Sequence, residues 1–194
     1  VAAPSLVLLG ESWAGVLIGI SVCVYVRGRP IGGAALGLLA LFVRELSAPY
    51  CAACTVIAAY NRRWRELALW GIGACSYAVY YGLHLAHVWA AQVPADAIRE
   101  RTWLTAGGLP FLLTTVRWAG WPFVLPDAAL AVTLVLIVAG VANPRAPVHV
   151  RASSAAYMTF FLLAGQPFNH YWGLMAAPTC VSPEASRWQA RSGA

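Results

Sequence analysis

Long apolar stretches interrupted by short arginine-bearing turns constrain this 194-residue chain more than any other feature. Each apolar stretch predicts a helix, and each interruption predicts a turn facing the cytoplasm. The stretches span 5–26, 31–43, 48–60, 67–90, 128–142 and 153–165, and the turns are 27–30, 61–66 and 143–147.

The composition favours a membrane environment. Sixty percent of the residues are apolar, only 10% are charged, and the mean hydropathy is +0.67. A soluble globular domain normally contains about 25% charged residues. All 13 basic residues are arginine, and the net charge is +6. These arginines are scattered between apolar flanks, which indicates cytoplasmic loops rather than a nucleic-acid partner.

The cysteines and the start of the chain carry weaker signals. The five cysteines have no regular spacing and predict no disulfide framework. Cys51 and Cys54 have the spacing of a CxxC motif, but an apolar helix offers no setting that stabilises a thiolate, so we expect core packing. The chain opens on Val1 without a basic segment, which predicts no signal peptide and suggests a piece of a longer protein.

The segment from Ile31 to Tyr60 decides the expected topology. As one helix it would be about 45 Å long, well beyond the roughly 30 Å hydrocarbon core. A hairpin that turns between Arg44 and Pro49 places the arginines of turns 27–30 and 61–66 on one side, as the positive-inside rule requires. The prediction is therefore an all-α, polytopic transmembrane helix bundle of about six spans, with both termini outside.

Residues 91–127 form the expected outer segment. Within it, 109–124 is predicted to be an amphipathic helical piece that lies in the outer interface, since it carries Arg117 and is flanked by prolines. The main alternative is that 109–124 crosses the membrane, which would reverse the orientation of every later helix.

Several polar residues are predicted to share one level near the outer face. Counted upward from the arginine turns at 1.5 Å per residue, they lie roughly 21 to 27 Å above those turns. Because buried charges are costly in a membrane, a shared level suggests a common polar cavity. Termination of each helix at the interface explains the spacing equally well. The residues are Glu11, Arg44, His84, Asp127 and Gln166.

Two groups of this layer are candidate binding residues. Arg44 is a candidate phosphate contact with Glu45 as its orienting partner, and a structural ion pair is the alternative. Near the last span, polar and aromatic side chains suit a sugar ring as well as they suit interface anchoring. With Glu11, this cavity and sugar-binding set contains Gln166, Asn169, His170 and Tyr171.

His84 and His87 share a helix face without an acidic or cysteine neighbour at helix spacing. Tyrosines and a tryptophan surround them, which is typical of an aromatic belt. We therefore predict neither a metal nor another cofactor.

Four segments together resemble the later membrane helices of bacterial GT-C type glycosyltransferases, the group that includes protein mannosyltransferase and lipid A sugar transferase relatives. The resemblance covers residues 10–175, and the Arg-Glu hairpin between arginine-rich turns is its most specific element. The segments are Glu11-Ser-Trp-Ala-Gly-Val-Leu, Arg27-Gly-Arg, Ala40-Leu-Phe-Val-Arg-Glu-Leu-Ser-Ala-Pro49 and Arg62-Arg-Trp-Arg-Glu66.

The resemblance implies a multi-pass enzyme of the bacterial inner (plasma) membrane that takes a sugar from a polyprenyl-phosphate donor on the periplasmic side. In that family the catalytic acid lies in the first outer loop, which this sequence does not match, so no catalytic residue is assigned. Residues 1–175 would form the transmembrane domain of a C-terminal portion, and 176–194 a polar tail. The alternative is a non-catalytic membrane subunit that packs against partner chains in a larger complex.

Overall fold

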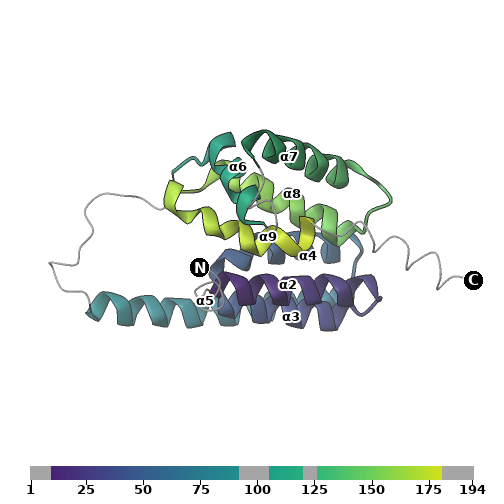
Figure 1. Cartoon of the computed structure of the whole chain (residues 1–194). Helices are drawn as coiled ribbons and strands as arrows, with labels where there is room; N and C mark the ends of the chain where they lie inside the picture. Colours follow the sequence, from purple (N-terminus) through teal and green to yellow (C-terminus); the bar gives the residue numbers. More distant parts are fainter. Residues whose placement is uncertain (1–9, 92–104, 120–125, 181–194) are drawn as a thin grey trace, which may run out of the picture.

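A computed structural model describes residues 10–91, 105–119 and 126–180, and within these ranges the protein is entirely helical (Figure 1). This confirms the all-α class. The elements are α2 (Gly10–Val26), α3 (Pro30–Val43), the short 3₁₀ helix η1 (Glu45–Ser47), α4 (Ala48–Tyr60), α5 (Trp64–Ala91), α6 (Gly108–Trp118), α7 (Asp127–Ala142), α8 (Val148–Leu163), the 3₁₀ helix η4 (Pro167–Trp172) and α9 (Gly173–Cys180).

A helix overlaps each of the six apolar stretches. The three predicted turns are present but shorter than expected at two places, because α3 begins at Pro30 and α5 at Trp64, inside the predicted turns 27–30 and 61–66. No helix in 10–91, 105–119 or 126–180 has both the length and the apolar character that a membrane crossing needs.

The predicted hairpin between Ile31 and Tyr60 is present, and one detail of it was wrong. The chain leaves the helix at Arg44, whose φ and ψ of −152° and 123° are extended. Ala48 was expected to be non-helical because it precedes Pro49. It instead has φ −54° and ψ −41° and begins α4, where the missing N–H of Pro49 falls in the first turn and costs no helical hydrogen bond.

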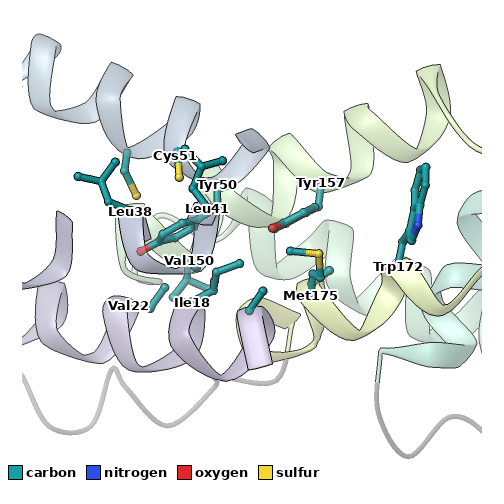
Figure 2. Packing of buried hydrophobic residues seen from close by; sticks show 14 of the residues in the cluster. Ile18, Val22, Leu38, Leu41, Tyr50, Cys51, Val150, Tyr157, Trp172 and Met175 are labelled. Atoms are coloured by element: carbon teal, nitrogen blue, oxygen red, sulfur yellow. The ribbon is translucent and has the colours of Figure 1, made fainter. Parts of the chain in front are cut away.

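The core joins an N-terminal half, α2 to α5, to a C-terminal half, α6 to α9. Helix α2 packs against α3 and α9, and α4 packs against α8. Figure 2 shows side chains of both halves meeting in one apolar cluster, which includes Ile18, Tyr50, Tyr157 and Met175. Cys51 and Cys54 are buried in α4, so the expectation of core packing for this pair is confirmed.

Glycines let some helices approach closely. A methyl group at Gly73 of α5 would collide with the side chain of Leu38 of α3. One at Gly173 of α9 would collide with the backbone of Thr115 of α6. The contact at Gly173 therefore needs a residue without a Cβ, whereas at Gly73 a Cβ would require the Leu38 side chain to move.

Helix α5 extends well beyond the ends of α2 and α3 (Figure 1). From Gly71 onward nearly all of its residues are exposed or half-buried, with Gly73 as the exception. Its exposed side chains include Ile72, Val79, Leu83 and Trp89.

The predicted amphipathic piece, 109–124, contains α6. One face of this helix is buried, through Phe111, Leu112, Thr115 and Val116, and it packs against α7, α8, η4 and α9. Residues 120–125 lie outside the described ranges. At the C-terminal end, α9 runs past residue 175, where the polar tail was expected to begin, and 181–194 also lie outside the described residues.

Candidate functional site

Arg44 lies at the break between the two arms of the helical hairpin. Its backbone N–H still bonds to Ala40 O at 2.9 Å, and its carbonyl accepts the N–H of Ser47 at 3.0 Å. The Ser47 hydroxyl also donates to Ala40 O at 3.0 Å. The extended Arg44 is therefore held on both sides by hydrogen bonds of the turn.

The nearest partner of the Arg44 guanidinium is Glu11 of α2. Nη2 of Arg44 lies 2.6 Å from Oε1 of Glu11, and the Glu11 side chain is only 3% exposed. The contact is ionic without hydrogen-bond geometry, and the buried Nε of Arg44 has no hydrogen-bond partner among the described residues. A buried carboxylate thus holds an arginine that still reaches the surface, with 33% of its side chain exposed.

Glu45, the expected orienting partner, makes the weaker contact. Its Oε1 lies 3.8 Å from Nη1 of Arg44, and 47% of its side chain is exposed. Exposed ion pairs at this distance contribute little, about 0 to 1 kcal/mol. The structure therefore adds Glu11 as the close partner and leaves Glu45 at the rim.

The remaining predicted residues form a second group around η4. Gln166 donates from Nε2 to Thr105 Oγ1 at 2.7 Å, and the Tyr171 hydroxyl donates to Oδ1 of the fully buried Asn169 at 3.3 Å. The His170 ring lies 4.8 Å from the ring of Trp118 on α6. These contacts connect η4 to α6, and they connect Gln166, just before η4, to Thr105, just before α6.

The contacts thus sort the predicted site residues into two groups. Glu11, Arg44 and Glu45 meet at the start of α2 and the hairpin turn. Gln166, Asn169, His170 and Tyr171 belong to the η4 region. A separate crevice with an apolar lining lies among α6, α7, α8 and α9, next to Leu112, Leu134, Tyr157, Phe161 and Ala176, and none of the predicted site residues lines it.

The two histidines of α5 lie on its exposed half. The His84 ring stacks on Tyr80 with a centroid distance of 6.4 Å, and His87 Nδ1 lies 2.7 Å from the carbonyl oxygen of Leu83. Within the described ranges, no group of three or more His, Cys, Asp or Glu side chains is placed to hold a metal ion.

Sequence reasoning missed a buried polar cluster at the opposite end of α2. The Tyr25 hydroxyl donates to Oε1 of Glu66 at 2.8 Å, and Nη1 of Arg63 lies 3.5 Å from Oε2 of the same carboxylate. His149 of α8 stacks on Tyr25 with a centroid distance of 4.0 Å. A signal was present in the sequence, because Glu66 is the only acidic residue in turns 27–30, 61–66 and 143–147.

His149 occupies an environment that disfavours its charged form. Burial and, to a smaller extent, the positive charge of Arg63 together lower its pKa from 6.5 to about 4. Its Nε2 is buried and has no hydrogen-bond partner among the described residues. His149 is therefore neutral at pH 7.

Comparison with known protein families, with curated proteins and with solved structures finds no match.

Proposed function

We propose that this chain is the membrane-embedded helical part of a GT-C type glycosyltransferase, in which Arg44 contacts the phosphate of a polyprenyl-phosphate sugar donor on the outer face of a bacterial inner membrane. The supporting observation is the asymmetry around Arg44. One guanidinium nitrogen is held by the buried Glu11, whereas the other faces the exposed and distant Glu45.

In this proposal, phosphate takes the place of Glu45. One arginine against two carboxylates carries a formal charge of −1, which would repel an anion while both acids stay in place. The 3.8 Å contact between Arg44 and the half-exposed Glu45 contributes little free energy, so its loss on phosphate binding costs little. Glu11 would keep the guanidinium oriented through Nη2, so that Nη1, which faces Glu45 at the rim, could donate to a phosphate oxygen. Gln166, Asn169, His170 and Tyr171 are the proposed contacts to the sugar.

The apolar exterior supports membrane embedding. Large apolar side chains are exposed on several helices, among them Val56, Ile72, Val135, Leu136 and Leu163. So much exposed apolar surface is unusual for a water-facing monomer. In the proposed arrangement, 27–30, 61–66 and 143–151 face the cytoplasm, while 44–49 and 91–127 face outward.

Thiol labelling tests this arrangement. A cysteine introduced at position 46 or 63 would be treated with a membrane-impermeant reagent in a chain that keeps the buried Cys51 and Cys54. Its other native cysteines, Cys23, Cys75 and Cys180, are replaced by serine. We expect labelling at 46 from outside and at 63 only after the membrane is opened. Labelling of both positions from the same side would refute the topology.

Binding of a polyprenyl phosphate by the full chain tests the role of Arg44. We expect Arg44→Lys to weaken binding nearly as much as Arg44→Ala, because an ammonium lacks the planar fork that contacts Glu11 with one nitrogen and phosphate with another. Glu45→Gln should strengthen binding, since it removes the competing carboxylate. Unchanged binding in the Arg44→Leu, Glu11→Leu double variant, together with restored thermal stability, would show that the pair is structural.

A second candidate is a non-catalytic membrane subunit, and the projecting half of α5 favours it. A helix that leaves Val79, Leu83 and Trp89 exposed offers a surface for a partner chain. A photo-crosslinking residue at position 83 distinguishes the candidates in native membranes. A discrete protein adduct would support the subunit, whereas adducts with lipid alone would count against it.

A further inference from the structure

Three helix-connecting turns bring six exposed arginines to one end of the molecule. We define the arginine face as Arg27, Arg29, Arg62, Arg63, Arg65 and Arg145. Arg151 is left out because its Nε donates to Val141 O at 2.8 Å at the end of α7.

Contacts between the helices fix this convergence. Tyr25, just before the first turn, bonds to Glu66, the last residue of the second. Tyr25 also stacks on His149, just after the third turn. The α2–α3, α4–α5 and α7–α8 connections accordingly lie at the same end of the bundle (Figure 1).

Little acidic charge offsets the arginine face. Glu66 is the only acidic residue in these three turns, and its side chain is 1% exposed because it faces inward to Tyr25. Apart from Arg63, whose Nη1 lies 3.5 Å from Oε2 of Glu66, the guanidinium groups therefore present positive charge to whatever lies beyond the end of the bundle.

Arg62 occupies a position at which glycine is the favoured residue. Its φ is +54°, in the left-handed region that strains a residue with a Cβ. The first turn has the same geometry with Gly28, whose φ is +72°. In both turns the next residue donates its N–H to a carbonyl five positions earlier, Arg29 to Val24 and Arg63 to Ala58. The second turn thus keeps a charged side chain despite the unfavourable backbone conformation.

Aromatic side chains flank the arginines. Tyr60, two residues before Arg62, is 88% exposed, and Trp64, directly after Arg63, is 69% exposed. Tyrosine and tryptophan prefer the headgroup level of a bilayer, where one part of the ring system is apolar and another is wet.

We propose that the arginine face binds the phosphate-bearing headgroups of an anionic lipid surface. Clustered arginines supply the attraction to the headgroups, and Tyr60 and Trp64 supply anchoring at the level where the headgroups end. This surface lies at the opposite end of α2 from Arg44, so the proposal does not depend on a sugar donor binding there.

Energy transfer from tryptophan to a dansyl-labelled lipid measures the binding. The full chain in neutral detergent would be titrated with phosphatidylglycerol or with phosphatidylcholine at constant ionic strength. We expect at least tenfold tighter binding of phosphatidylglycerol. Equal affinity for the two lipids would overturn the proposal, as would displacement of the lipid by millimolar inorganic phosphate or by single-stranded RNA.

Variants at the two equivalent turn positions, Arg62 and Gly28, separate the effect of charge on lipid binding from the effect of backbone strain on stability. Arg62→Gly should weaken phosphatidylglycerol binding about fivefold while it raises the thermal midpoint, because glycine relieves the strain. Gly28→Arg should tighten binding and lower the midpoint. Arg117→Gln, on α6, removes the same charge away from the arginine face and should leave binding unchanged. Equal weakening by Arg62→Gly and Arg117→Gln would show that only net charge matters and would overturn the proposal.

Discussion

The two ends of helix α2 each bury one carboxylate, and the two carboxylates are held differently. Glu66, beside the end of α2, accepts the hydroxyl of the buried Tyr25, with Arg63 at 3.5 Å on its other oxygen. Glu11, at the start of α2, lies against Arg44, whose side chain is one-third exposed. Both arginines reach the surface, Arg63 with 42% and Arg44 with 33% of its side chain exposed. The first arrangement is closed by the buried Tyr25 hydroxyl, whereas Oε1 of Glu11 has no hydrogen-bond partner among the described residues, and this end remains open to an incoming group.

This difference indicates where a ligand can enter without disrupting the fold. Removal of one partner from a closed polar cluster leaves another buried group unpaired, which is expensive. At the open end, the released guanidinium can turn toward water or toward a ligand. We therefore expect changes at Glu66 to affect mainly stability, and changes at Arg44 and Glu45 to affect mainly binding.

Leucine substitutions at the two carboxylates give the largest expected contrast. Glu66→Leu should lower the free energy of unfolding by about 3 kcal/mol, because the Tyr25 hydroxyl and Arg63 lose their acceptor. Glu11→Leu should cost less, about 1 kcal/mol, since no buried hydroxyl loses its acceptor and the partly exposed Arg44 side chain can turn toward water. Chemical denaturation of both variants in the same detergent measures the difference. Equal losses would remove the distinction between a closed and an open end.

The pH dependence of stability probes the closed end through His149. Its folded pKa, about 4, lies below the unfolded value of 6.5, so the unfolded state binds more protons between these values. The stabilisation is present above pH 6.5 and is lost as the pH falls toward 4. Between pH 7 and pH 5 the loss should be about 2 kcal/mol. Denaturation midpoints of wild type and His149→Gln at both pH values test this, and an equal slope in the variant would contradict it.

Two glycine-to-alanine variants test whether the Tyr25 ring at the closed end can move. A Cβ at Gly33 of α3 would lie 2.6 Å from the Tyr25 ring, whereas one at Gly71 of α5 would meet nothing within 4 Å. Gly33→Ala should destabilise by about 1 kcal/mol, because crowding outweighs the gain in helix propensity. Gly71→Ala should stabilise by up to about 1 kcal/mol. Thermal midpoints that rise in both variants would show that the Tyr25 ring moves freely.

The smallest expected effect on stability is at the rim of the open end. Glu45→Gln should change the free energy of unfolding by no more than about 0.5 kcal/mol, because the contact to Arg44 is long and exposed. The same denaturation experiment serves as the measurement. A loss as large as that of Glu66→Leu would mean that the open end is as rigid as the closed one.

The pattern of apolar stretches was enough to predict the helices and the break between Arg44 and Pro49. It did not predict the conformation of Ala48, since the restriction before proline is a preference that the first turn of a helix can accommodate. It also assigned Glu45, the sequence neighbour, as the partner of Arg44. The closer partner, Glu11, lies on α2, which packs beside the turn only in the folded structure.

Apolar length and arginine position are local properties, so the sequence by itself determined the all-helical class and the placement of the arginine turns. The tertiary structure decided which side chains meet. Glu11 reaches Arg44 across 33 positions, and His149 reaches Tyr25 across 124. Helices such as α2, α3 and α7 are apolar nearly all round, so their sequences do not mark which face turns inward. Only the packing of one helix on another selects that face and the polar groups it brings together.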